Sequence, residues 1–313
     1  MRSVLSVVGT RPNLMKTAPV IAALARRPGE FRHVLVHTGQ HYDAAMSQVF
    51  FDELAIPAPD HFLDVGSGTH AQQTARVMER LEPVLVAEQP DVVLVPGDVN
   101  STLAAALTAA KLGIEVGHIE AGLRSGDWTM PEEVNRVVTD TLSSLLFVHS
   151  PEATGNLVDE GHDDAEIHYV GNTMIDTLVA MRERIEATAI GERLGLERGG
   201  YLVVTLHRPA LVDGPLLHAA LAALAAVAAS VPVVFPVHPR TRARIAAEGL
   251  APDANGALRL LEPLGYLDFL ALVAGDEVDD PQALDPEPDP VVEVDAARVG
   301  STMLDRRAHP LEQ

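Results

Sequence analysis

Short apolar runs rich in β-branched residues alternate along this chain with alanine-rich stretches of helical spacing. The runs expected to be strands are SVLSVVG, HVLVHTG, DVVLVPGD, EVGHIEAG, LLFVHS and EIHYVG. A polar or Gly/Pro loop follows each run, and helix candidates such as TAPVIAALARR and STLAAALTAAKLG come after two of them. This alternation is typical of βαβ units on a parallel sheet. It predicts an α/β fold whose ligands bind beyond the carboxyl ends of the strands.

The strand series begins anew after a charged, periodic segment near residue 172. This segment, NTMIDTLVAMRERIEATAIGERLG, is followed by YLVVTLHRP and VPVVFPVHPR. We therefore expect a first Rossmann-like domain over residues 1–172 and a partial second one over 173–274. Residues 275–313 carry 11 acidic residues and five prolines, a composition that predicts a disordered tail.

Charge and cysteine content exclude several classes of partner. A formal net charge of −21 at pH 7 disfavours nucleic acid and anionic membrane as general partners. The chain has no cysteine, which excludes thiolate metal sites and cysteine nucleophiles and favours a cytoplasmic location. The first apolar run ends at Gly9 and is much shorter than the roughly 20 residues that cross a bilayer. We expect it to be a buried strand.

The exits of the first and third predicted strands carry charged residues. In GTRPNLMK, Gly9 allows a tight turn, and Arg11 and Lys16 would flank the start of a helix. Such a turn is either a diphosphate cradle or an ordinary βα turn with two solvated cations, and the spacing alone does not decide between them. In VPGDVNST, Asp98 follows the strand, and capping of the next helix is its favoured role.

The fourth exit carries a dense charged cluster, HIEAGLRSGDWTMPEEVNR, whose ionisable members include Glu120, Glu132, Glu133 and Arg136. If the acids share one pocket, their mutual repulsion would raise at least one pKa, which suits acid–base chemistry. The alternative is a surface loop in which the acids favour a helix start and pair with Arg136.

The second half repeats this arrangement with basic residues. His207 and Arg208 stand at the end of one strand, and His238 and Arg240 follow the next. A lone histidine is more often structural, but two basic exits side by side could hold a phosphate or a sugar hydroxyl. Phe269 would either pack in a core or stack on a planar base. The 13 histidines show no metal-ligand spacing, and no GxSxG or dinucleotide fingerprint is present.

Together, the segments VVGTRPN, TGQHYD, PGDVNST, HIEAGLRSGDWTMPEEVNR, VGNTMID, TLHRPA and FPVHPRTR resemble the non-hydrolysing UDP-N-acetylglucosamine 2-epimerases over about residues 1–274. The resemblance implies a GT-B-like α/β fold of two Rossmann-like domains with parallel sheets, the second truncated, and an active site in the cleft between them. It also implies interconversion of UDP-N-acetylglucosamine and UDP-N-acetylmannosamine without metal or cofactor. Such enzymes eliminate UDP from carbon 1, form a 2-acetamidoglucal, and add UDP back after protonation from the other face.

The same resemblance assigns roles to individual residues. The matched catalytic residues are Asp98, Glu120, Glu132 and His207, and the substrate-binding residues are Arg11, Lys16, Arg136, Arg208, His238 and Phe269. Gln40 and His41 match part of an allosteric site. The resemblance further implies a UDP-sugar as partner and a homodimer. Two alternatives stay open, namely an inactive relative that binds UDP weakly or not at all, and a GT-B glycosyltransferase.

Overall fold

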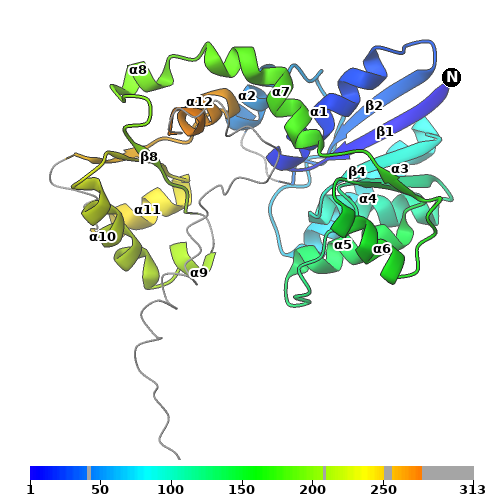
Figure 1. Ribbon diagram of the computed structural model, residues 1–313. Coiled ribbons are helices and arrows are strands. Elements are labelled where there is room, and N and C mark those ends of the chain that lie inside the picture. Colours follow the sequence, from blue (N-terminus) through cyan, green and yellow to red (C-terminus); the bar gives the residue numbers. More distant parts are fainter. Residues whose placement is uncertain (41–43, 207–208, 250–255, 277–313) are drawn as a thin grey trace, which may run out of the picture. The chain divides into compact units, whose positions relative to one another are not determined.

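The computed structural model describes residues 1–40, 44–206, 209–249 and 256–276. The chain divides into two compact units, residues 1–183 and residues from 184 onward (Figure 1). Helix α7 (Thr173–Glu186) crosses the limit between them. The predicted domain limits at 172 and 274 therefore stay predictions, and the predicted disordered tail lies almost wholly outside the described residues.

The first unit is built on a seven-stranded sheet in the order β3-β2-β1-β4-β5-β6-β7, and all its paired strands are parallel. Its strands are β1 (Arg2–Val8), β2 (Phe31–His37), β3 (His61–Phe62), β4 (Val92–Pro96), β5 (Glu115–Ile119), β6 (Leu145–Val148) and β7 (Ile167–Tyr169). The six predicted strands are confirmed. The sequence did not reveal β3, because two residues carry no periodicity.

Helices α1 to α6 connect these strands, and α7 follows the last one. Their bounds are α1 (Arg11–Ala25), α2 (Ala44–Glu53), α3 (His70–Glu88), α4 (Asn100–Lys111), α5 (Pro131–Leu142) and α6 (Pro151–Asp159). Every residue of β4 is buried, which explains its unbroken apolar run, since a central parallel strand has helices on both faces. The main core lies between this sheet and helices α3 and α4.

The second unit contains, within its described residues, a three-stranded parallel sheet in the order β10-β9-β8. Its strands are β8 (Leu202–Val203), β9 (Val233–Pro236) and β10 (Leu258–Leu261), and its helices are α8 (Ile190–Leu194), α9 (Pro209–Val212), α10 (Leu216–Ala228), α11 (Pro239–Ala247) and α12 (Tyr266–Asp276). The core gathers around the buried side chains of Phe235 and Leu217. In the parts of both units that the structure describes, no helix is both long and apolar enough to cross a membrane.

Candidate functional site

The order of the first sheet reverses at β1 and β4. From β1 the chain proceeds to β2 and β3 on one side, and it then returns to β4 and continues through β7 on the other. Connections on the two sides diverge at such a switch point, which is where ligands bind in open parallel sheets. The exits of β1, β4 and β5 meet here because β4 pairs with both neighbours.

At the first of these exits, β1 passes into α1 through a turn stabilised by Asn13. The Asn13 Oδ1 atom accepts hydrogen bonds from the backbone N–H groups of Gly9 and Thr10, each at 3.1 Å. Pro12 stands in the first turn of α1, as expected from the sequence. Position 9 requires glycine, however, because there is no room for a side chain: an added Cβ would lie 2.3 Å from Ser101 Oγ. This close approach, rather than a left-handed turn, excludes a side chain.

A lysine–glutamate pair joins the exits of β1 and β5. Lys16 Nζ of α1 forms an ion pair with Glu120 Oε2, and the two side chains are only 12% and 22% exposed. Gly97 lies beside the pair, since a Cβ at this position would be 2.9 Å from Lys16 Nζ. Glu120 has a φ of +73°, an uncommon conformation for a non-glycine residue that concentrates at functional sites.

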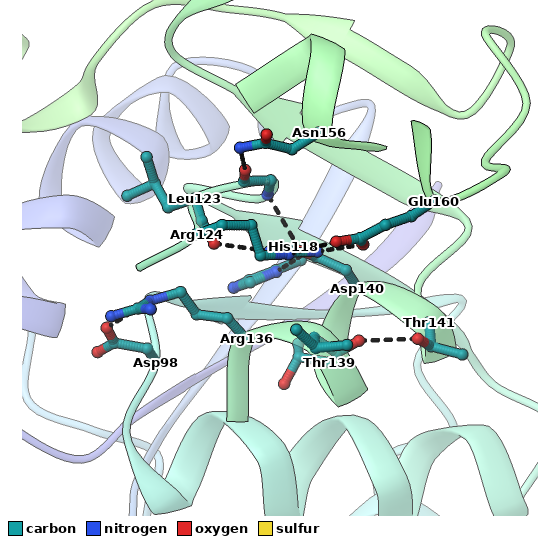
Figure 2. A network of polar contacts seen from close by, with 12 residues as sticks. Asp98, His118, Leu123, Arg124, Arg136, Thr139, Asp140, Thr141, Asn156 and Glu160 are labelled. Atoms are coloured by element: carbon teal, nitrogen blue, oxygen red, sulfur yellow. Dashed lines mark hydrogen bonds and ion pairs between the residues drawn. The ribbon is translucent and has the colours of Figure 1, made fainter. Parts of the chain in front are cut away.

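Asp98, at the exit of β4, does not cap α4. The N-cap of α4 is Val99, which makes no side-chain hydrogen bond, so the favoured interpretation from sequence is wrong. Instead, Asp98 Oδ2 accepts a hydrogen bond at 3.0 Å from Arg136 Nε of α5 (Figure 2). Sequence reasoning could not foresee this pair, because it depends on how α5 packs beside the end of β4.

The two adjacent glutamates at the start of α5 have different environments. Glu133 is 1% exposed, accepts hydrogen bonds from the N–H groups of Ser125 and Gly126 at 2.8 to 3.1 Å, and pairs with Arg136. Burial opposes its ionisation, but these N–H donors and the guanidinium outweigh burial and hold the pKa of Glu133 below its ordinary value. The expected rise in pKa is therefore not what this carboxylate shows. Glu132 is half-buried and has no polar partner among the described residues.

A second polar network lies beneath these exits. His118 of β5 bonds through Nδ1 to Asp140 Oδ1 of α5 at 2.5 Å and through Nε2 to the Gly97 carbonyl oxygen at 2.7 Å. Arg124 connects Asp140 Oδ2, 2.8 Å away, to Glu160, as Figure 2 shows. Although burial would raise it, the pKa of Asp140 is lowered by His118 and Arg124. Neither His118 nor Asp140 is marked as a site residue by the sequence pattern.

A small hollow lies beyond the ends of β5, β6 and β7, next to Glu120. Its lining residues are Ile119, Glu120, Phe147, His149, Val170, Gly171, Asn172 and Thr173. His149 and Asn172 were not predicted, and they add polar groups that could contact a ligand at the same exits. Within the described residues, no group of three or more His, Asp or Glu side chains could hold a metal ion.

Arg11 and Gln40 are the remaining predicted residues of the first unit that the structure describes, and each has a partner within this unit. Arg11 is half-buried and stands 5.7 Å from the ring centre of Phe50, a favourable cation–π distance. Gln40 is buried, and its Oε1 accepts hydrogen bonds from Ser101 N at 3.0 Å and Ser101 Oγ at 2.6 Å. His41 lies outside the described residues, and the allosteric role of Gln40 and His41 stays a prediction.

In the second unit, His238 is the N-cap of α11, where its Nδ1 accepts a hydrogen bond from Arg240 N at 3.3 Å. The Arg240 side chain pairs with Asp213 at 2.7 Å. Phe269 is half-buried in α12. His207 and Arg208, which carry much of the predicted chemistry of this half, lie outside the described residues.

Comparison with known proteins places these features in a family. A family model described as UDP-N-acetylglucosamine 2-epimerase matches residues 22–277. A UDP-N-acetylglucosamine 2-epimerase of Methanococcus maripaludis is 40% identical over 274 residues, which are 85% of this chain and 74% of that protein. A UDP-2,3-diacetamido-2,3-dideoxy-D-glucuronate 2-epimerase of Pseudomonas aeruginosa is 41% identical over 275 residues, which are 86% of this chain and 75% of that protein.

Solved structures agree. The crystal structure of Methanocaldococcus jannaschii UDP-GlcNAc 2-epimerase in complex with UDP-GlcNAc and UDP has a TM-score of 0.77 and 38% identity, and it covers 87% of this chain and 76% of that one. UDP-GlcNAc 2-epimerase from Neisseria meningitidis, bound to UDP-GlcNAc, has a TM-score of 0.77 and 30% identity, with 86% and 75% covered. The expected GT-B-like α/β fold is thereby confirmed.

Proposed function

This chain belongs to the UDP-N-acetylglucosamine 2-epimerase family, and from that premise we propose that it interconverts UDP-N-acetylglucosamine and UDP-N-acetylmannosamine. The observation that carries the proposal is the pair of carboxylate–cation contacts at the switch point. Glu120 pairs with Lys16, and Asp98 pairs with Arg136, on either side of the turn that follows β4. Carboxylates and cations therefore stand within one set of strand exits, and we assign them acid–base and phosphate-binding roles.

The chemistry of inversion needs both kinds of group. The proton on carbon 2 of the sugar is too weakly acidic for simple removal, so UDP leaves carbon 1 as this proton is taken, and a 2-acetamidoglucal results. Carboxylates serve as the base on one face and the acid on the other. In this proposal Asp98, Glu120 and Glu132 supply these groups together with His207.

The cations would act on the leaving diphosphate. Lys16 pairs with Glu120, and a diphosphate bound beside Lys16 would compete for its ammonium group and free Glu120 to act on the sugar. Arg11 precedes it in the first turn of α1, where the helix end also favours an anion. Positive groups placed where negative charge develops commonly contribute a factor of about 10² to 10³ in rate.

The second unit would bind the nucleotide. His238 at the start of α11 and Phe269 of α12 are proposed as contacts of UDP, with Phe269 stacking on the uracil ring, and Arg208 as a further phosphate contact. The match of TLHRPA and FPVHPRTR to the family pattern supports these assignments. A homodimer and a cytoplasmic location belong to the same proposal, and the absence of cysteine favours the location.

A second substrate competes with the first. The Pseudomonas aeruginosa relative acts, by its name, on UDP-2,3-diacetamido-2,3-dideoxy-D-glucuronate and is 41% identical to this chain, so identity alone does not separate the two sugars. Parallel assays with both nucleotide sugars decide which is turned over faster. A transferase would instead consume the nucleotide sugar only when an acceptor sugar is added.

The chain supplies its own matched control for the site. Its only lysines are Lys16 and Lys111, and Lys111 is exposed in the last turn of α4. The test is formation of the mannosamine epimer from UDP-N-acetylglucosamine by the full chain. Lys16→Met should lower kcat/KM by roughly 100-fold, while Lys111→Met should leave it unchanged. If the wild-type chain forms no UDP-N-acetylmannosamine and UDP does not stabilise it thermally, the proposed function is refuted.

A further inference from the structure

We propose that His118 is a positioning residue, a doubly protonated imidazolium that holds the turn carrying Asp98 by donating a hydrogen bond to the Gly97 carbonyl oxygen. The polar partners of His118 are Asp140 and the Gly97 carbonyl oxygen, not Asp98, Glu120 or Glu132, so it would act through the backbone of this turn. The effect of His118 on Asp98 in turnover rests on the proposed function, whereas the charge on the His118 ring does not.

Hydrogen bonding fixes the protons on the imidazole ring. The Gly97 carbonyl oxygen can only accept, so His118 Nε2, 2.7 Å away, must carry a proton. On the other side, Nδ1 lies 2.5 Å from Asp140 Oδ1. Asp140 Oδ2 already accepts from Gly122 N at 3.1 Å and pairs with Arg124 at 2.8 Å. These donors favour the carboxylate form of Asp140, so Nδ1 must donate as well.

The charges around the ring balance. The network runs from Glu160 through Arg124 and Asp140 to His118, alternating negative and positive, so its formal charges cancel when the ring is protonated. His118 and Asp140 are both 0% exposed and Arg124 is 12% exposed. A buried charge is tolerated when it is paired and hydrogen-bonded. The charged side chains that face the ring are Asp140 from α5 and, behind it, Arg124 from the loop after β5, while the β4 exit presents only a carbonyl group.

The turn after β4 is held at each of its carbonyl groups. Pro96 O accepts from Asn13 Nδ2 at 3.0 Å and Thr102 Oγ1 at 2.7 Å. Gly97 O accepts from His118, and Asp98 O accepts from Asn135 Nδ2 at 2.8 Å. Among these donors only the imidazolium is charged, and charge-assisted hydrogen bonds are roughly twice as strong as neutral ones.

The position of this turn affects both proposed acid–base pairs. Asp98 follows Gly97 directly, and a Cβ on Gly97 would lie 2.9 Å from Lys16 Nζ and 3.8 Å from Glu120 Oε2. A shift of the Gly97–Asp98 peptide would therefore move the Asp98 carboxylate and change the space beside the Lys16–Glu120 pair. His118 is thus expected to affect turnover more than substrate binding.

Nitrogen-15 NMR of the histidine ring tests the charge state without any need for catalysis. In the wild-type chain at neutral pH, both ring nitrogens of His118 should carry a proton. In Asp140→Asn, which removes the negative partner, Nδ1 should lose its proton. A neutral His118 ring in the wild-type protein would overturn the proposal, whether or not the chain proves to be an epimerase.

Two substitutions separate the two ends of the ring. A glutamine amide can reach about as far as Nε2 and keep the donor to Gly97, whereas an asparagine amide replaces Nδ1 and leaves the Gly97 carbonyl without its donor. His118→Asn should lower kcat by about 100-fold, the cost of a misplacement near 1 Å, with little change in KM. His118→Gln should retain most of the activity at the same folded fraction.

Equal kcat values for the two variants would overturn the positioning role and leave His118 a merely structural residue. The Asp98 amide resonance gives the same comparison without substrate: it should stay in place in His118→Gln and move in His118→Asn. If wild-type turnover is absent, the proposed function fails while this resonance and the ring nitrogens still decide the inference.

Discussion

Replacing Glu133 by glutamine should lower the stability of the first unit, whereas replacing its neighbour Glu132 by glutamine should lower activity. Glu133 is buried and holds the loop after β5 through the N–H groups of Ser125 and Gly126, while Glu132 is half-buried and makes no polar contact with another described residue. Glu132 is nevertheless one of the proposed acid–base groups. The pair is therefore a matched test that differs by one position in the same helix turn.

The magnitude follows from the contacts of Glu133. Its carboxylate receives two backbone N–H groups and the Arg136 guanidinium. A glutamine at this position loses the charge and turns an NH₂ group toward donors that still need an acceptor. Hydrogen bonds to charged groups contribute about 1.5 to 3 kcal/mol each, and breaking a buried pair costs about 3 to 5 kcal/mol. We expect Glu133→Gln to lose roughly 3 kcal/mol, or about 6 to 12 °C in the Tm of a unit of this size.

Glu132→Gln should change stability by less than about 0.5 kcal/mol and lower kcat by about 10² to 10⁴. Circular dichroism melts give the Tm of each variant, and epimer formation per folded molecule gives kcat. Equal melting temperatures for the two variants would refute the structural role of Glu133. Wild-type turnover in Glu132→Gln would refute the catalytic role of Glu132.

Three further outcomes follow from single groups near the switch point. Gly97→Ala should lose about 1 to 2 kcal/mol, because φ is +67° and a side chain in that region is strained, and it should also lower turnover by pushing Lys16 away from Glu120; a Tm and kcat equal to wild type would contradict this. His37, in β2, has a pKa lowered to about 4 by burial, against an ordinary value of 6.5; the unfolded chain therefore binds a proton that the folded one does not, and the first unit should lose about 3 kcal/mol as pH falls from 6.5 to 4. Hydrogen exchange of the β2 amides at several pH values measures this loss of stability, and the loss should be absent in His37→Gln. The pKa of Asp140 in the folded state lies below the usual 3.8 despite burial. The Asp140 carboxylate therefore stabilises the fold fully above about pH 4, and this stabilisation is lost as the pH falls further. Asp140→Asn should make the free energy of unfolding depend less on pH in that acid range.

Periodicity predicted the first sheet apart from the two-residue strand β3, because its central strands are covered on both faces and therefore form unbroken apolar runs in the sequence. The same pattern predicts where the strands end, and it therefore marks Lys16, Asp98 and Glu120 as candidate site residues. The partners of these residues were not predictable. The contact of Asp98 with Arg136 joins positions 38 residues apart, and local propensity favoured a cap instead.

One missed feature left a usable signal. Glu133, Arg136 and Asp140 are spaced i, i+3 and i+7 along α5, so they share one face of the helix. Apolar residues usually mark the buried face of a helix, but this polar face of α5 is turned toward the sheet, where His118 and the loop after β5 satisfy its charges. His118 itself, within EVGHI, resembles an ordinary strand residue, and only the packing of α5 on β5 reveals its partner. The roles of His207, Arg208 and His41 stay predictions.

Deuterium at carbon 2 of the product is the most direct evidence for the proposed chemistry. The full chain is incubated with UDP-N-acetylglucosamine in deuterated water, and the nucleotide sugars are examined by proton NMR and mass spectrometry. Removal and return of the carbon 2 proton by side chains in exchange with solvent predicts UDP-N-acetylmannosamine that carries one deuterium at this carbon. An epimer without deuterium, or no epimer from either candidate substrate, would contradict it.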